Sequence, residues 1–433
     1  MCIFPNTRTC FRIYGKIKVR MIREKEAMVL KFLHCADLHL DSPFKGLSHL
    51  PREIFERIRH STFRAFSEIV SVAIKEQVDF IVIAGDIYDG DSRSLRAQSY
   101  FRKELGRLDA QGITVYMIHG NHDHLEGTWI DLEWPKNVHL FDGGHPQSVP
   151  FYKNGRLKAM LHGFSYEKRS VAENRVPFYP AKSGDDVYHI GILHGNAEGQ
   201  NGHEAYAPFR VAELFEKGYD YWALGHIHKR MELHHDPPVI YPGNIQGRNQ
   251  KETGPKGCLI IDLQNKRRTF HETNDIYWLE KNIDLTDLSS VSEMIDHCLD
   301  IKENARIQGK GILLKLVLNG HSALFNEMEQ EGLLEELLET LQAGEGDQTS
   351  FVYTFAIINQ TRRNWNREEL QNDGGFIGAL LTNGTEYIQT QKTTKELYLH
   401  RKARKYIDPL TPNEEKEIVD EAETLLLQFL LKD

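Results

Sequence analysis

Residues 79–89 read DFIVIAGDIYD, an apolar run that ends in glycine and aspartate. Its β-branched and aromatic residues predict a short buried strand, and the polar residues predict the loop that follows it. Four other segments share this design: VLKFLHCADLH at 29–39, ITVYMIHGNHDH at 113–124, HIGILHG at 189–195 and DYWALGHIH at 220–228. Because helix-period segments such as 52–77 separate the strands, the sequence predicts a layered α/β fold.

Side chains that can hold metal directly follow each of the five runs. They are Asp37, His39, Asp86, Asn121, His194, His226 and His228. In layered α/β folds the loops beyond the strand ends meet in one crevice, so residues far apart in sequence can lie together there. A lone Asp-x-His is commonly a surface loop, and a lone histidine commonly packs in a core. Five such clusters in this order nevertheless predict one assembled metal site.

Two metal ions suit this mixture of side chains. A carboxylate has two oxygens and can bridge two ions, which makes Asp86 the candidate bridge. The expected ligands of one ion are Asp37, His39 and His228, and those of the other are Asn121, His194 and His226. Two dications about 3.5 to 4 Å apart clamp the attacking and leaving oxygens of a phosphoester displacement. Imidazole and carboxylate ligands are compatible with manganese, zinc or iron.

His122 directly follows a predicted ligand, and we expect its ring to point away from the metals. An imidazole that titrates near neutral pH can donate a proton or a hydrogen bond to the departing oxygen. Either Asp89 or Asp123 could orient the ring, and the sequence leaves both open. The remaining histidines are expected to be structural, with His124 and His162 as the exceptions that their positions favour most.

Five short patterns resemble those of the calcineurin-type metallophosphoesterases. They are DLH at 37–39, GDIYD at 85–89, GNHDH at 120–124, LHG at 193–195 and GHIH at 225–228. Within that superfamily, the chain is most similar to DNA repair exonucleases of the SbcD and Mre11 type, above all to the YhaO-like proteins of Bacillus-type bacteria. The resemblance covers about residues 28–270 and includes ADLHLDSPFKG at 36–46 and YPGNIQGR at 241–248.

This resemblance implies a two-sheet sandwich flanked by helices. It also implies two divalent metal ions, usually manganese, with the ligand roles given above. His122 matches the catalytic histidine of the family. Through the C-terminal helices, the resemblance further implies binding to the coiled coil of an SbcC or Rad50-like ATPase.

The chain departs from its relatives at two loops. A phosphoprotein phosphatase would place arginine in the pattern GDxxDRG, where this chain has Asp89-Gly90-Asp91. The nuclease family commonly has glycine after DxHL, where this chain has Asp41, and a proline-containing segment where residues 91–94 read DSRS. These differences concern loops expected to contact DNA, so they bear on the recognition of duplex ends more than on hydrolysis.

We expect three domains after a basic leader. Residues 1–27 hold seven Lys or Arg and two Glu without the order of a signal peptide, which indicates a disordered leader or a translation-start artefact. The domains are a metallophosphoesterase domain at 28–270, a smaller α/β capping-like domain at 271–365 and a helical region at 366–433. Strands at 312–320 and 350–359 flank an amphipathic segment at 323–342, and helices are predicted at 366–382, 392–406 and 411–431.

Composition limits the class of protein. The 433 residues are 40% hydrophobic, which is enough to build several cores. No apolar stretch reaches the ~18 to 20 residues that cross a bilayer, so no membrane association is expected. Five cysteines without a CxxC pair favour a reducing, cytoplasmic location. Residues 271–433 carry a net charge of −14, so any DNA contact is expected on the catalytic face and in local clusters such as Lys266-Arg267-Arg268. A solvated loop is nevertheless the simpler interpretation of that cluster.

These patterns predict a metal-dependent phosphodiester hydrolase, namely a DNA exonuclease or endonuclease that acts in repair with an SbcC/Rad50-like ATPase. Two alternatives stay open. One is a phosphoesterase for nucleotides or other small phosphodiesters, since one site of this type serves many substrates. The other is a non-catalytic scaffold subunit of an ATPase complex. The chain has no GxxxxGK[ST] loop, GxSxG elbow or GxGxxG fingerprint. A homodimer is a further expectation, because relatives often dimerise.

Overall fold

The computed structural model describes only part of the chain. The described residues are 30–44, 46–47, 50–90, 93–127, 130, 132–198, 206–330, 332–363, 365, 367–372, 374–388, 400 and 411–431. The predicted leader at 1–27 and nearly all of the predicted helix at 392–406 lie outside these residues. The chain divides into two compact units: Met1–Lys281 with His297–Val317 and Leu334–Ile358, and Asn282–Asp296 with Leu318–Leu333 and Asn359–Asp433. The predicted domain boundaries at 270 and 365 stay predictions.

A six-stranded sheet contains the first three predicted strands. In spatial order its strands are β12 (Arg267–Glu272), β11 (Gly257–Asp262), β1 (Lys31–Cys35), β2 (Phe80–Ala84), β3 (Thr114–Ile118) and β4 (Val138–Leu140). From β1 to β4 the neighbours pair in parallel, whereas β11 is antiparallel to both β1 and β12. Parallel pairing brings the carboxyl ends of β1, β2 and β3 to one edge, where Asp37, Asp86 and Asn121 follow.

A second six-stranded sheet contains the other two predicted strands. In spatial order its strands are β5 (Gln147–Lys153), β6 (Arg156–Gly163), β7 (Tyr188–His194), β8 (Tyr221–Gly225), β10 (Pro238–Tyr241) and β9 (Met231–His235). From β6 to β10 the neighbours again pair in parallel. This arrangement brings His194, the last residue of β7, beside the end of β8, which His226 follows.

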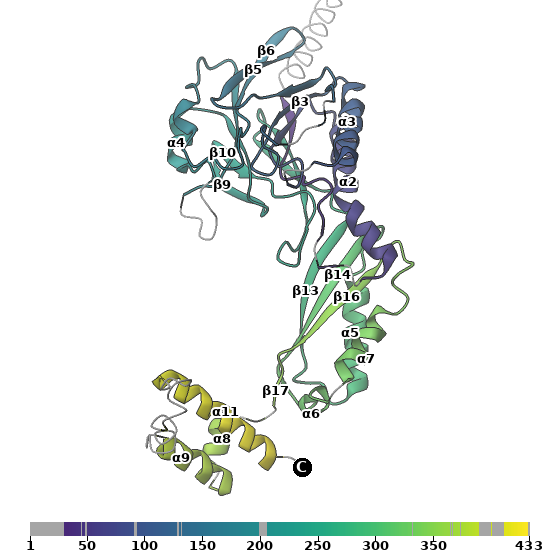
Figure 1. Ribbon diagram of the computed structural model, residues 1–433, viewed down its shortest axis with the longest axis vertical. Coiled ribbons are helices and arrows are strands. Elements are labelled where there is room, and N and C mark those ends of the chain that lie inside the picture. Colours follow the sequence, from purple (N-terminus) through teal and green to yellow (C-terminus); the bar gives the residue numbers. More distant parts are fainter. Residues whose placement is uncertain are drawn as a thin grey trace, which may run out of the picture. The chain divides into compact units, whose positions relative to one another are not determined.

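Helices cover the outer face of the first sheet. Because successive side chains of a strand point to opposite faces, Leu33 and Cys35 of β1 share one core with α2 (Arg52–Lys75) and α3 (Leu95–Asp109). Figure 1 shows α2 and α3 side by side on this face. On the outer face of the second sheet, Trp222 and Leu224 belong to another core that includes Leu214 of α4 (Val211–Glu216).

The two sheets face each other through a shared apolar core. Phe32 of β1 stacks on Phe80 of β2 with ring centroids 5.0 Å apart. It also meets Tyr221 of the second sheet edge-on at 5.3 Å, which is a favourable geometry for aromatic rings. Ile190 and Ala223 from the second sheet complete this layer. The predicted two-sheet sandwich with flanking helices is therefore confirmed.

The later part of the chain contains β13 (Ile276–Asp284), α5 (Val291–Asn304), β14 (Gly311–Asn319), β15 (His321–Ser322), α6 (Phe325–Met328), α7 (Leu333–Gln342), β16 (Val352–Asn359), β17 (Arg362–Arg363), α8 (Arg367–Asn372), α9 (Phe376–Ile388) and α11 (Pro412–Leu430). Two predicted helices are divided here, and β13, α5, β15 and β17 are elements that the sequence did not predict. The sheet order is β13-β14-β16, and β14 and β16 match the predicted strands.

Two segments that were each predicted as one helix form two shorter helices instead. The amphipathic segment at 323–342 forms α6 and α7, because Gly332 between them adopts a left-handed backbone with φ of +98°. The segment at 366–382 forms α8 and α9, with Gly374 and Gly375 in the interval, where glycine weakens a helix. The prediction of α11 is confirmed, and it begins with a reciprocal cap between Thr411 and Glu414.

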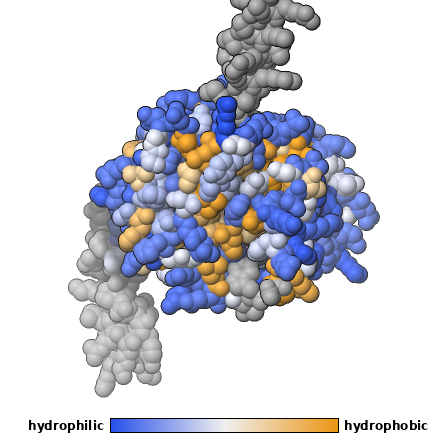
Figure 2. Space-filling view, turned by 90° about the horizontal axis from the view of Figure 1, so that it is seen from above, coloured by the Kyte–Doolittle hydropathy of each residue, from blue (hydrophilic) through white to orange (hydrophobic). Residues whose placement is uncertain are grey.

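One face of the molecule is mostly hydrophilic (Figure 2). Figure 2 shows that polar residues surround smaller apolar areas on this face. Scattered exposed apolar groups of this kind are normal for folded proteins. Among the described residues, no helix combines the length and the apolar character that crossing a membrane requires.

Acid should destabilise the fold through His34. Its buried ring contacts the Tyr221 hydroxyl at 2.9 Å, and burial lowers its pKa to about 3. The unfolded chain binds a proton at the ordinary histidine pKa near 6.5, so the free energy of unfolding falls as the pH drops from about 6.5 toward 3. From pH 7 to pH 5 the loss attributable to this group is about 2 kcal/mol.

Urea titrations at both pH values should therefore show a smaller acid-induced loss for His34→Gln than for the wild type. The difference should be about 2 kcal/mol. His145→Gln, at an exposed position, is the control and should behave like the wild type. An unchanged pH dependence in His34→Gln would contradict this account.

Candidate metal centre

The loops that follow the strands turn sharply. Asp37, His39, Asp86 and His226 have φ values of 53°, 43°, 52° and 100°, in the left-handed region that non-glycine residues seldom adopt. Such conformations cost about 1 to 3 kcal/mol each and persist where surrounding contacts enforce them. Here the backbone N–H of Asp37 donates to the Gly85 carbonyl at 3.1 Å, and that of His39 donates to the Asp86 carbonyl at 3.0 Å. The turns therefore fix side chains at the strand ends.

Two glycines make room for these side chains. A Cβ on Gly85 would fall too close to Nδ1 of His194, and this residue also has a φ of +88°. A Cβ on Gly120 would collide with the Asp86 carboxylate and with the His194 ring. Close packing thus requires both glycines, and the left-handed backbone is a second reason for glycine at Gly85 alone.

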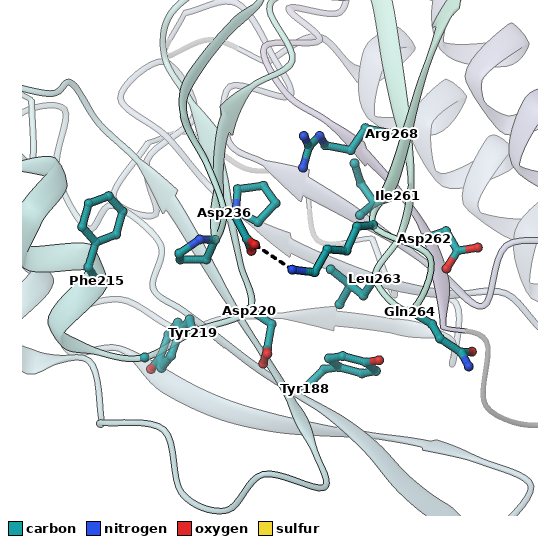
Figure 3. Close-up of a pocket in the computed structure, with 14 residues that line it drawn as sticks. Tyr188, Phe215, Tyr219, Asp220, Asp236, Ile261, Asp262, Leu263, Gln264 and Arg268 are labelled. Carbon is teal, nitrogen blue, oxygen red and sulfur yellow. Dashed lines mark hydrogen bonds and ion pairs between the residues drawn. The ribbon is translucent and has the colours of Figure 1, made fainter.

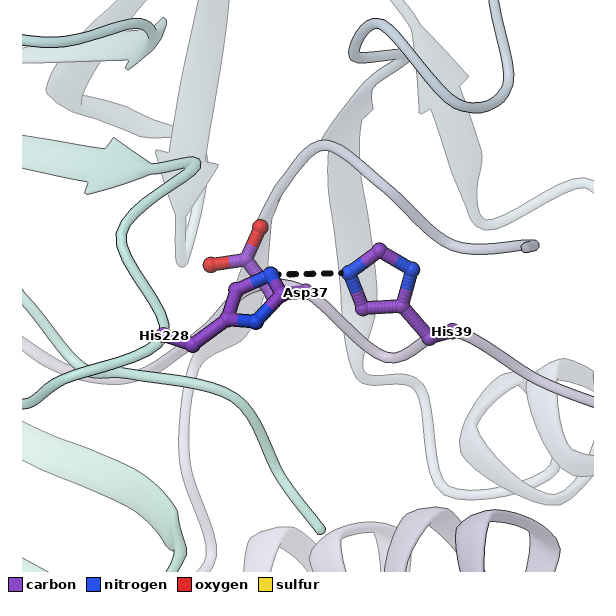
Figure 4. Close-up of side chains that lie close together, drawn as sticks. All are labelled: Asp37, His39 and His228. Carbon is purple, nitrogen blue, oxygen red and sulfur yellow. Dashed lines mark hydrogen bonds between the residues drawn. The ribbon is translucent and has the colours of Figure 1, made fainter. Parts of the chain in front are cut away.

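One group of potential ligands contains Asp37, His39 and His228 (Figure 4). Nε2 of His39 and Nε2 of His228 lie 3.1 Å apart, and the two rings approach each other beside Asp37. The backbone N–H of His226 donates to Oδ1 of Asp37 at 3.0 Å, which holds this carboxylate in place. The three ligand atoms all lie within 4.8 Å of one another, close enough to share one cation.

A second group contains Asp86, His194 and His226. The side-chain oxygen of Asn121 joins it, 3.0 Å from Nε2 of His194 and 3.2 Å from Nδ1 of His226. The structure therefore places all seven predicted ligands in two neighbouring groups. Carboxylate, imidazole and amide groups are ligands that first-row divalent metals accept.

Asp86 lies between the two groups. Its Oδ2 atom is 3.4 Å from Nε2 of His194 and 3.8 Å from Nε2 of His39. Its other oxygen accepts the backbone N–H of His122 at 2.9 Å. One carboxylate oxygen is thus within reach of histidines from both groups, as a bridging ligand requires.

Hydrogen bonds at Nδ1 of His194 and His228 decide which ring nitrogen of each histidine is available to a metal ion. Nδ1 of His194 contacts the carbonyl oxygen of Ala84 at 2.9 Å, and Nδ1 of His228 contacts Oε1 of Glu252 at 2.7 Å. Both partners can only accept, so Nδ1 carries the proton in each ring. The Nε2 atoms are then the ones available to a cation, which is the usual arrangement of metal-binding histidines.

The electrostatics of the site also suit cations. Burial disfavours charge on His194, but the Asp86 and Asp37 carboxylates raise the pKa of this ring to about 9. Burial lowers the pKa of His39 well below its ordinary value, and the Arg248 guanidinium acts in the same direction. A proton on His194 and a metal ion would compete for the same nitrogen, so metal binding here should release protons.

His122 pairs with Asp89. Nδ1 of His122 lies 3.2 Å from Oδ1 of Asp89, and this hydrogen bond raises the pKa of the ring. Asp89 is itself held by Ser42, whose hydroxyl donates at 2.8 Å, and by Arg248, which donates at 3.0 Å. With His39, the pair forms a third group of potential ligands. Since one-third of the His122 side chain is exposed, its ring remains accessible to a substrate.

The structure answers the question of the orienting carboxylate in favour of Asp89. Asp123 is fully buried and accepts the backbone N–H groups of Ile87 at 2.7 Å and Gly120 at 2.6 Å. It also lies 3.1 Å from Nδ1 of His119. Asp123 therefore holds the two site loops together and does not orient His122.

The two histidines singled out as exceptions belong to none of the three groups found among the described residues. His162 lies 2.8 Å from the Ser148 hydroxyl and 2.9 Å from Nδ1 of His189. Burial lowers the pKa of His162 to about 3, as expected for a neutral structural ring. The main-chain oxygen of His124 accepts a hydrogen bond from Arg93 at 2.7 Å.

Two residues of the site were missed by the sequence reasoning. Arg248 belongs to the segment YPGNIQGR, but nothing in that pattern indicates its contact with Asp89, 159 positions earlier. Glu252 follows that segment and meets His228 from a separate loop. Burial favours the neutral form of Glu252, yet the hydrogen bond from His228 and the nearby positive charges lower its pKa to about 2.

A separate cavity of about 480 Å³ contains none of the predicted site residues (Figure 3). Tyr188 and Asp220, which line it, lie at the starts of β7 and β8, whereas the metal-binding candidates lie at the ends of these strands. Lys266 pairs with Asp236 at 2.6 Å, and Asp220 pairs with Lys182 at 2.9 Å. Asp220, Asp236 and Lys266 of this cavity are therefore already paired.

Comparisons with known proteins agree with this geometry. The family model for calcineurin-like phosphoesterases matches residues 30–230. The chain is 40% identical to the "Uncharacterized metallophosphoesterase YhaO" of Bacillus subtilis over 93% of this chain and 98% of the relative. It is 25% identical to the "DNA double-strand break repair protein Mre11" of Sulfurisphaera tokodaii over 56% of this chain and 62% of the relative.

A further relative is a component of the nuclease SbcCD from Staphylococcus saprophyticus, at 25% identity over 55% of this chain and 67% of the relative. The resemblance inferred from the five motifs is thus confirmed. Members of the matching family bind divalent metals, in keeping with the grouped side chains. Because the similarity to the Bacillus relative extends over nearly the whole of both proteins, the chain belongs to the calcineurin-like metallophosphoesterase family.

Proposed function

We propose that this metallophosphoesterase is a two-metal phosphodiester hydrolase that cuts DNA. The observation that carries the proposal is the position of Asp86, whose Oδ2 atom lies 3.4 Å and 3.8 Å from ring nitrogens of the two groups. A carboxylate that could be shared by two cations is characteristic of sites in which two cations act on one phosphorus centre. When bound, the cations, preferably manganese, would activate water and stabilise charge on the phosphoester oxygens.

The residues divide into two sets of ligands with one shared member. Asp86 would contribute to both ions. The set for one ion is Asp37, His39 and His228, and the set for the other is Asn121, His194 and His226. Most of these groups are neutral, so the bound ions would leave positive charge that attracts an anionic phosphodiester.

His122 would donate the proton that the departing oxygen needs. Its Nδ1 atom is held by Asp89, so Nε2 is free to face a substrate. The Asp89 hydrogen bond raises the pKa of His122 and keeps its ring protonated closer to neutral pH, as a general acid requires. Ser42 and Arg248 hold Asp89 from the other side and so restrict the ring indirectly.

DNA is the proposed substrate because relatives that share the chain's metallophosphoesterase region are named for break repair and nuclease activity. We also propose a cytoplasmic setting and an SbcC/Rad50-like ATPase partner that binds the C-terminal helices. In support, α11 exposes Leu425, Leu426 and Phe429, a set of large apolar side chains that a helical partner would cover.

The substrate class can be tested directly. Purified protein with Mn²⁺ should cut linear or single-stranded DNA and should hydrolyse bis-p-nitrophenyl phosphate, and removal of metal by EDTA should abolish both activities. Hydrolysis of the small diester without any DNA cleavage, with or without a co-purified ATPase, would favour a small phosphodiester as substrate. Metal binding with neither activity would favour the scaffold alternative.

Replacing His122 separates catalysis from metal binding. Since the ring supplies a proton to a basic alkoxide leaving group, His122→Ala should lower kcat for DNA cleavage by about 10²- to 10⁴-fold. Two metal ions per chain should remain by plasma mass spectrometry. His235→Ala, which removes an exposed histidine that also pairs with a carboxylate, is the control and should retain full kcat. Loss of one metal ion in His122→Ala would instead make His122 a ligand.

Asp86→Asn tests the bridge. An amide offers one oxygen and no negative charge, so this variant should hold fewer than two metal ions per chain and lose measurable hydrolysis. Asp79→Asn, at the opposite end of β2, is a matched control because Asp79 contacts Lys153 and the Lys31 backbone. It should keep both ions. Two tightly bound ions in Asp86→Asn would refute the bridging role.

A further inference from the structure

The largely buried carboxylate of Glu252 lies at the centre of a loop behind the metal site. Its side chain is 13% exposed and accepts three N–H groups. Oε1 accepts from Nδ1 of His228 at 2.7 Å, while Oε2 accepts from the Asn244 side chain and from the Arg248 backbone, each at 2.7 Å. These contacts tie residues 244–252 to the ring of one predicted ligand.

The same loop also fixes the main chain of His228. Its carbonyl oxygen accepts the backbone N–H of Asn244 at 3.2 Å and the ammonium group of Lys256 at 3.1 Å. Both the ring and the backbone of His228 are therefore held by this loop and by Lys256. With Nδ1 bound to a carboxylate, Nε2 is aimed at His39, 3.1 Å away.

The two ligand groups differ in these outer contacts. His194, in the group with Asp86, donates Nδ1–H to the main-chain carbonyl of Ala84 at 2.9 Å. His228, in the group with Asp37 and His39, relies on a charged side chain instead. A carboxylate behind an imidazole raises its strength as a ligand more than a neutral carbonyl does, and loss of such a partner typically weakens metal binding 10- to 100-fold.

We propose that Glu252 is a positioning residue for one of the two metal ions, the ion held by Asp37, His39 and His228. This inference rests on the proposed two-metal function. Glu252 itself does not touch the substrate or the ions and acts through the His228 ring. The second ion, on the side of His194, should not depend on Glu252, because no contact connects that group to this carboxylate among the described residues.

Arg248 extends the influence of the same loop. Its backbone N–H donates to the Glu252 carboxylate, while its guanidinium donates to Oδ2 of Asp89 at 3.0 Å. Asp89 in turn holds His122. The loop thus orients both a ligand of one ion, His228, and the proposed proton donor, His122. Arg248→Lys should disturb the orientation of His122 without lowering the affinity for either ion.

The test is Mn²⁺ binding by calorimetry and electron paramagnetic resonance on the full-length protein. The wild type should bind two ions and give the spectrum of a coupled pair. Glu252→Gln should weaken one ion by about 10-fold and Glu252→Ala by up to about 100-fold, while the other ion keeps its affinity. At one equivalent of Mn²⁺ both variants should give the spectrum of an isolated ion.

The control is Glu232→Gln, which changes a carboxylate that also pairs with a histidine at 2.7 Å, but at the exposed His235. It should bind both ions as the wild type does. Unfolding temperatures of the metal-free proteins show whether a variant has merely lost stability; if Glu252→Ala does not fold, Glu252→Gln decides. Equal weakening of both ions, or of neither, would overturn the inference. A wild type that binds no pair of ions would instead overturn the proposed function.

Discussion

One carboxylate oxygen within reach of histidines from two groups is the constraint on which the site depends. Oδ2 of Asp86 can lie near His39 and His194 only if the first and second sheets end at a common edge. Parallel pairing of β1, β2 and β3, and of β7 and β8, creates that edge. The aromatic layer between the sheets then fixes their separation, so the packing of the core determines the distance between the groups.

Parts of this geometry are locally unfavourable, both in backbone conformation and in the burial of charged groups. Several site residues adopt left-handed backbone conformations, and carboxylates and imidazoles are buried together at low exposure. Backbone hydrogen bonds between the loops after β1 and β2 oppose the strain, and Asp123 secures the loop after β3 by accepting N–H groups. The cluster of charges is a further cost that bound cations would offset. Metal binding at this site is therefore expected to stabilise the folded state.

The sequence predicted much of this arrangement because each ligand follows a strand directly and the patterns are local. The two-sheet fold is confirmed, and the seven predicted ligands lie together, although their metal-binding roles stay predictions. The choice between Asp89 and Asp123 could not be made from the sequence. Asp123 is next to His122 in the chain, Asp89 follows the neighbouring strand, and only tertiary packing shows which carboxylate meets the ring. Glu252 could not be found, since its contact with His228 depends on how two loops meet.

The most direct test of the shared carboxylate is an anomalous difference map from crystals soaked in Mn²⁺. The account predicts two peaks roughly 3.5 to 4 Å apart, with Oδ2 of Asp86 between them and His39 and His194 on opposite sides. A single peak, or two peaks that do not share Asp86, would contradict it.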